Sequence, residues 1–228
     1  MRMRIPRCYD VRYRRSVRGV IFDMDGVLVL SEPFIAEAAI RMFAEKGHQI
    51  GEDEFRPFIG MGEDRFIGGV AERRGIALDP ARDKARTYAI YDDLVRGRLH
   101  PTPGAREFVR ACRAKGLAIA VASGGQGEGR REPAGARPSR IGVRRGHRRN
   151  PGRAQEARAR HLPGCLPRLA LAPADCLVVE DALSGVQAAK AAGARCLGLT
   201  TSFDSAALAA ADWTAPDLAH VPEAALDW

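Results

Sequence analysis

The sequence predicts an α/β fold, in which a parallel sheet has helices on both faces and a small helical unit is inserted into it. Short apolar runs at 18–23, 117–122, 177–179 and 195–199 each stop at polar residues or glycine, as buried parallel strands do. Helical patterns separate the first run from the second and the third from the fourth, which is typical of chains that alternate strand and helix. The segment 33–98 lies between the first two runs and shows only helical patterns.

Composition is that of a globular protein of one large domain, or a domain that carries an insertion, in its 228 residues. No apolar run approaches the length of a membrane span, so we expect no membrane partner. The Arg-rich N-terminus lacks the apolar segment of a secretory signal. The five cysteines are odd in number and form no C-x-x-C pair, so we expect free thiols in a cytoplasmic protein.

The net charge of +8 is concentrated in two segments. Residues 1–18 carry +6 and residues 126–168 carry +9, which leaves −7 for the rest of the chain. A nucleic-acid binder should have a basic face on its folded part, often with interleaved aromatic residues, and 126–168 contains no aromatic residue. We therefore expect no nucleic-acid partner, and residues 1–17 are predicted to be a disordered basic lead; a weak nucleic-acid arm, with steeply salt-dependent binding, is the alternative.

The first apolar run ends in two carboxylates, Asp23 and Asp25. Alternate residues of a strand point to the same side, so both would point the same way at the carboxyl end of the strand. Open α/β sheets bind their ligands at that end. Two carboxylates this close repel each other unless a cation or a shared proton compensates them, so the pair predicts a functional site.

Three helices are predicted in the inserted segment 33–98. The first begins at Glu32, has apolar residues at helical spacing and stops at Gly47. The others are Arg65–Arg74 and Pro80–Val95. A helical unit inserted after the first strand can act as a lid that excludes water from a charged reaction centre.

The second strand ends in a hydroxyl and two glycines. The loop at 100–104 is proline-rich, a helix follows at Ala105–Lys115, and the strand at 117–122 ends in Ser123, Gly124 and Gly125. Such a turn lets backbone N–H groups approach an anion closely. Taken alone this is a weak signal, since Ser-Gly is also common in turns.

The last part of the chain repeats the alternation. The strand at 177–179 ends in the acidic pair Glu180 and Asp181, and a helix is predicted at Ala182–Gly193. The strand at 195–199 is followed by three hydroxyl residues and a predicted helix at about Ser205–Ala211. Asp181 could simply cap its helix, which is compatible with a metal role as well.

The strings FDMDGVLVLSEP at 22–33 and VVEDALSGVQAA at 178–189, with Ser123 between them, resemble motifs of the haloacid dehalogenase-like superfamily. The resemblance implies a Rossmann-like core at 18–32 and 99–228, with a helical cap at 33–98. It implies that Asp23 is a nucleophile and Asp25 an acid/base, which indicates the phosphatase and phosphomutase branch. It also implies Mg²⁺ bound by Asp23, the Asp25 carbonyl and Asp181, with Glu180 nearby, and a phosphoryl site at Ser123 and Gly124.

The cap position and the second string resemble the β-phosphoglucomutase and sugar-phosphate phosphatase subgroup. The mutases have an arginine in a Gly-Val-Ser-Arg cap loop, where this chain has Gly60-Met-Gly-Glu63. An acidic residue there disfavours a second phosphate, so the resemblance implies hydrolysis of a small phosphorylated metabolite by a monomeric enzyme. Arg65 lies close to Glu63 in sequence and could supply the positive charge that a mutase needs, so a mutase is the alternative. Glu63 and Arg65 are both candidate substrate-binding residues.

Residues 126–168 differ in composition from the rest and are predicted to be irregular. They contain no Asp and no Lys but many Arg, Gly and Pro. Read one nucleotide later, the degenerate codons for 156–165 permit KPAPDIYLAA, the third motif of the superfamily. We therefore hypothesise a pair of compensating frameshifts over about 127–167, real or from sequencing, which resequencing would settle. The motif lysine would then be missing, and an inactive product of a damaged gene is a further alternative.

Overall fold

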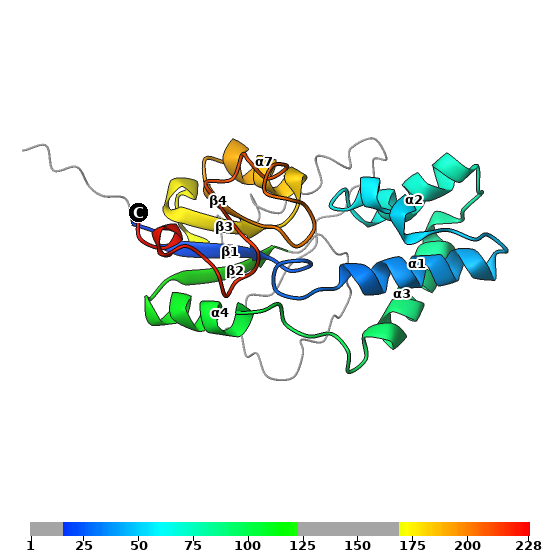
Figure 1. Cartoon of the computed structure of the whole chain (residues 1–228), viewed down its shortest axis with the longest axis horizontal. Helices are drawn as coiled ribbons and strands as arrows, with labels where there is room; N and C mark the ends of the chain where they lie inside the picture. Colours follow the sequence, from blue (N-terminus) through cyan, green and yellow to red (C-terminus); the bar gives the residue numbers. More distant parts are fainter. Residues whose placement is uncertain (1–15, 123–168) are drawn as a thin grey trace, which may run out of the picture.

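The computed structural model describes residues 16–122 and 169–228, and its sheet is parallel throughout (Figure 1). Its order is β2-β1-β3-β4-β5, and every neighbouring pair is parallel. The predicted α/β class is confirmed. The strands are β1 (Gly19–Asp23), β2 (Ala118–Ala122), β3 (Cys176–Glu180), β4 (Arg195–Leu199) and β5 (Trp213–Ala215).

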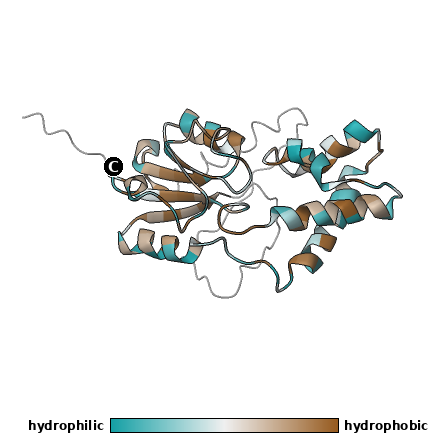
Figure 2. Cartoon of the chain, viewed as in Figure 1, coloured by the Kyte–Doolittle hydropathy of each residue, from teal (hydrophilic) through white to brown (hydrophobic). Residues whose placement is uncertain are grey.

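Strand β1 lies between β2 and β3, and its apolar residues pack on both faces of the sheet. Val20 and Phe22 pack on one face of the sheet. There the ring of Phe108, from α4 (Ala105–Ala114), meets the Phe22 ring edge to face, with 6.0 Å between the ring centres. Ile21 points to the other face, which α7 (Leu183–Ala191) covers. Figure 1 shows these two helices on opposite faces of the sheet, and Figure 2 shows the apolar residues concentrated in its strands.

The segment between β1 and β2 is helical and has an apolar cluster of its own. It contains α1 (Glu32–Glu45), α2 (Glu63–Arg74) and α3 (Pro80–Val95), with 3₁₀ turns at Glu52–Glu54 and Arg56–Phe58. Met42 and Phe43 of α1 are buried against Phe55 and against Tyr91 of α3. Within the described residues this segment has no β-strand, in agreement with its sequence pattern.

Two connections join the helical segment to the sheet, and they are bonded to each other. The hydroxyl of Thr102 donates to the Val27 carbonyl at 2.5 Å, and its backbone N–H donates to the Leu28 carbonyl at 3.0 Å. Thr102 is 2% exposed. The two crossings are therefore held side by side just beyond the carboxyl end of β1.

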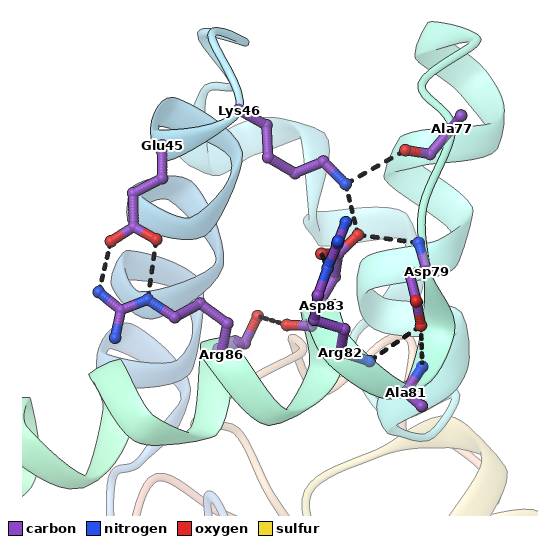
Figure 3. Close-up of polar contacts among 9 residues, drawn as sticks. Glu45, Lys46, Ala77, Asp79, Ala81, Arg82, Asp83 and Arg86 are labelled. Carbon is purple, nitrogen blue, oxygen red and sulfur yellow. Dashed lines mark hydrogen bonds and ion pairs between the residues drawn. The ribbon is translucent and has the colours of Figure 1, made fainter.

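An ion pair between a half-buried lysine and a buried carboxylate joins the end of α1 to the start of α3 (Figure 3). Lys46, next to the end of α1, bonds the Asp83 carboxylate and donates to the Ala77 carbonyl at 3.2 Å. Asp83 also accepts the Asp79 N–H at 2.9 Å, while Asp79 caps α3. The hydrogen bond from Lys46, opposed by burial, holds the pKa of Asp83 below its ordinary value.

We expect Lys46→Met to lower the free energy of unfolding by about 1–3 kcal/mol at pH 7, because the Asp83 carboxylate loses one partner and keeps only the Asp79 N–H and an ion pair with Arg82. Since the pKa of Asp83 is lowered in the folded state, the pair stabilises the fold above the pKa of the unfolded carboxyl. Its contribution is lost as the pH falls through the folded value, so the difference between the proteins should shrink below about pH 4. Urea unfolding as a function of pH measures both effects.

The matched control is Arg86→Met, which removes the neighbouring pair with Glu45. Those side chains are 52% and 46% exposed, and solvent screening leaves an exposed pair with little effect on stability. Equal losses of stability in the two variants would contradict a special role for the pair of Lys46 and Asp83.

The region after β4 differs from the prediction. Residues 205–211 form successive turns instead of a helix, with bonds such as Ala211 N–H to the Leu208 carbonyl. These turns bury Leu208 against Gly198 and lead to Asp212, whose N–H bonds the Cys196 carbonyl. The chain thus re-enters the sheet as β5, a strand of three residues that is too short to give an apolar pattern.

Other expectations concern residues outside the described ranges. These are Ser123, Gly124, the anomalous segment 126–168 with its missing lysine, and all but the end of the basic lead at 1–17. Among the described helices, none combines the length and apolar character that a membrane span requires.

Candidate active site

Three buried carboxylates meet at the carboxyl edge of the sheet. Asp23 ends β1, Glu180 ends the adjacent β3, and Asp181 follows it. They are 7%, 6% and 2% exposed, and each offers an oxygen within 4.8 Å of the others. Parallel neighbours end at the same edge, so the sheet itself brings these residues together. Asp25 lies two residues beyond Asp23, in the loop, and is half-buried.

Glu180 is held by the backbone at the start of α7. Its Oε2 accepts the N–H groups of Asp181 at 3.2 Å and Ala182 at 3.3 Å. A Cβ on Gly185 would lie 2.0 Å from the Glu180 Cδ, so only glycine lets the helix approach this carboxylate. Ala182, not Asp181, occupies the N-cap position of α7. The structure thus places Asp181 with the other carboxylates and not as a helix cap.

Asp25 is bonded to the residue that precedes the first inserted helix. The Ser31 hydroxyl donates to Asp25 Oδ1, and Ser31 is 3% exposed. Ser31 stands at the N-cap position of α1, yet its side chain makes no capping bond to that helix. Sequence reasoning gave Ser31 no role, although it lies inside the first motif string.

The loop after β4 supplies two further hydroxyls that the sequence reasoning did not assign. Thr201 Oγ1 donates to the Gly26 carbonyl at 2.7 Å, and Ser202 Oγ donates to Asp181 Oδ2 at 2.5 Å. The sequence signal that could have indicated these two residues is the run of hydroxyl residues at 200–202, directly after a predicted parallel strand. These hydroxyls border a cavity of about 600 Å³ lined by Thr200–Ser205 and Thr214–Pro216.

The loop before α2 touches the sheet portion beside the acidic cluster. The Ser184 hydroxyl, in the first turn of α7, donates to the Gly60 carbonyl at 2.9 Å. Glu63 is the first residue of α2. Arg65 bonds Glu72 of its own helix at 3.1 Å, and its guanidinium lies 5.7 Å from the centre of the Phe58 ring.

The residues of the cluster fit a hard divalent cation. Three carboxylates with oxygens this close repel one another, and burial strengthens the repulsion because little solvent screens it. Carboxylate oxygens at one point are the donors that Mg²⁺ prefers. The cluster could therefore hold a metal ion between β1 and β3.

Comparisons with known proteins identify the family of the chain. A family model described as haloacid dehalogenase-like hydrolase matches residues 17–193. The phosphorylated carbohydrates phosphatase of Thermotoga maritima is 30% identical over 78% of this chain and 82% of its own length. The chloroplastic protein SUPPRESSOR OF QUENCHING 1 of Arabidopsis thaliana is 36% identical over 85% of this chain, which spans 19% of that protein.

Among solved structures, CbbY from Rhodobacter sphaeroides in complex with phosphate superposes with a TM-score of 0.72. The alignment covers 93% of this chain and all of that one, at 20% identity, and so it shows the fold. The predicted Rossmann-like fold is thereby confirmed. The family model confirms the prediction of a hydrolytic enzyme. The chain belongs to the haloacid dehalogenase-like hydrolases.

Proposed function

We propose that the chain is a Mg²⁺-dependent phosphatase that hydrolyses a small phosphorylated metabolite of the sugar-phosphate kind. The observation that carries the proposal is the buried cluster of Asp23, Glu180 and Asp181, with oxygens within 4.8 Å and Asp25 two residues away. The Thermotoga maritima relative, which is named as a phosphatase of phosphorylated carbohydrates, supports the substrate class.

The proposed reaction proceeds in two displacements at phosphorus. A carboxylate oxygen of Asp23 attacks the phosphorus atom, and the bond to the ester oxygen breaks while Asp25 gives that oxygen a proton. Asp25 then removes a proton from water, whose oxygen attacks the aspartyl-phosphate and releases phosphate, which regenerates Asp23. The Ser31 hydroxyl orients Asp25 for both proton transfers.

The remaining parts of the site have supporting roles. Asp23, Glu180 and Asp181 would hold Mg²⁺, with the Asp25 carbonyl, and the bound ion would neutralise charge on the phosphoryl group. Ser123 and Gly124 remain the proposed phosphoryl-binding residues. The helical segment 33–98 is proposed as the cap over the core formed by 18–32 and 99–228, and Glu63 and Arg65 as residues that face the substrate.

Simple hydrolysis is preferred to phosphate transfer between two positions of a sugar. A mutase would need a cap residue that grips a second phosphate, and the loop position where the mutases have an arginine holds the acidic Glu63 in this chain. We further propose a monomeric cytoplasmic enzyme. Buried free thiols support a reducing compartment: burial raises the pKa of Cys112 to about 11, and Cys176 and Cys196 are also free and buried.

The test uses the full chain with an aryl phosphate, a panel of sugar phosphates, and Mg²⁺. We expect phosphate release that falls to background when a chelator removes the metal and returns when Mg²⁺ is restored. Conversion of glucose 1-phosphate to its 6-phosphate isomer without net phosphate release would instead indicate the mutase. No turnover under any condition would contradict the proposal and favour an inactive chain.

A further inference from the structure

Two hydroxyls beyond the end of β4 clamp the loops of β1 and β3 together. Thr201 bonds the Gly26 carbonyl at 2.7 Å, and the adjacent Ser202 bonds Asp181 Oδ2 at 2.5 Å. Gly26 follows the catalytic loop residue Asp25, while Asp181 belongs to the acidic cluster. The end of a third strand therefore ties two parts of the site, and the proposed reaction assigns it no task.

The carboxylate of Asp181 has two close neighbours at one oxygen. Ser202 donates to Oδ2, and Gly26 lies so close that a Cβ there would be 2.0 Å from the same oxygen. Gly26 has a φ of +75°, a conformation that favours glycine. Asp181 is 2% exposed, so its carboxylate cannot rotate without displacing one of these neighbours.

The donor itself is rigidly placed. Leu199, at the end of β4, is fully buried and pairs with Ala215 of β5. The ladder continues one residue further, because the Thr200 N–H donates to the Ala215 carbonyl at 2.9 Å. Thr201 and Ser202 follow directly, so their hydroxyls are positioned by the sheet.

We propose that Ser202 is a positioning residue for the cation site: it orients Asp181 so that one carboxylate oxygen faces the metal while the other accepts the hydroxyl. The inference rests on the proposed function, in that the cluster must take Mg²⁺. Residues that bond metal-ligating carboxylates commonly change metal affinity by about 10–100-fold when removed.

The decisive comparison is Ser202→Val against Ser202→Thr. The two replacements have nearly the same shape, but only threonine keeps a hydroxyl that can donate to Asp181. Ser202→Ala adds a smaller substitution in case valine crowds the site. Ser205→Ala is the matched control, because Ser205 lines the same cavity and is exposed.

Each protein is stripped of metal with a chelator, dialysed and titrated with Mg²⁺ in a calorimeter, and its thermal unfolding is recorded without metal. We expect the alanine and valine variants to bind Mg²⁺ about 10–100-fold more weakly. The threonine variant and the Ser205 control should stay within about twofold of the unsubstituted chain. Unfolding temperatures of the metal-free proteins should agree, which separates orientation of Asp181 from loss of structure.

The outcomes distinguish this inference from the proposed function. If the unsubstituted chain binds Mg²⁺ and the alanine and valine variants bind it equally well, the role of Ser202 is refuted and the metal site stands. If weaker binding appears in the threonine variant as well, the hydroxyl is not the cause and the role is also refuted. An unsubstituted chain that binds no Mg²⁺ refutes both.

Discussion

The Asp23→Asn variant is expected to lose at least about 10³-fold in kcat for phosphate release. An amide has no charged oxygen to attack phosphorus, so no covalent intermediate can form. The substitution also removes one of three carboxylates from the cluster, which weakens the cation site. The measurement is steady-state release of phosphate from an aryl phosphate at saturating Mg²⁺.

Two further variants test whether the loss of activity comes from the nucleophile itself. Asp53→Asn alters an acidic side chain that is 93% exposed, and it should retain full activity. Asp25→Asn keeps the nucleophile but removes the proton donor and acceptor, which typically costs about 10²–10⁴-fold. An Asp23→Asn protein that keeps a tenth of the original rate would show that another group is the nucleophile.

We expect the Gly185→Ala variant to have a free energy of unfolding that is lower by about 1–3 kcal/mol. Alanine normally stabilises a helix relative to glycine by about 1 kcal/mol. At this position the new Cβ would lie 2.0 Å from the carboxyl carbon of Glu180, so that side chain or α7 must shift. The displaced carboxylate should also weaken Mg²⁺ binding, which the same calorimetric titration detects.

The control for this effect is Gly68→Ala in α2. A Cβ at Gly68 has open space among the described residues, so only the helix preference acts there. We expect this variant to be more stable by about 1 kcal/mol, opposite in sign to Gly185→Ala. Chemical unfolding of the two variants side by side measures both values, and a gain in stability for Gly185→Ala would contradict the close packing of α7.

The sequence identified the four longer strands because a buried parallel strand leaves a dense apolar run. It also identified the carboxylates at their ends, since polar residues there break the apolar pattern. Strand β5 was not predicted, because three residues are too few to show a periodic pattern. A helix was expected at 205–211, but this segment forms turns because it must lead the chain back into the sheet.

Contacts between distant segments could not be predicted in the same way. The bonds from Ser31 to Asp25 and from Ser202 to Asp181 depend on where three loops end in space, and serine is common in loops for other reasons. The pair of Lys46 and Asp83 likewise joins two helices, and only the folded structure determines how these helices lie against each other. The phosphoryl-binding roles of Ser123 and Gly124 stay predictions.

The position of β1 between β2 and β3 has a consequence for how the site forms during folding. Gly19 pairs with Ala118 on one side and Cys176 on the other, so long stretches of chain must close before the catalytic edge exists. Such closures cost conformational entropy and slow folding. In contrast, α1 packs against α3 within one continuous stretch. The helical segment therefore has the shorter route to its native contacts, and the carboxylates come together only once β1 has paired with β3.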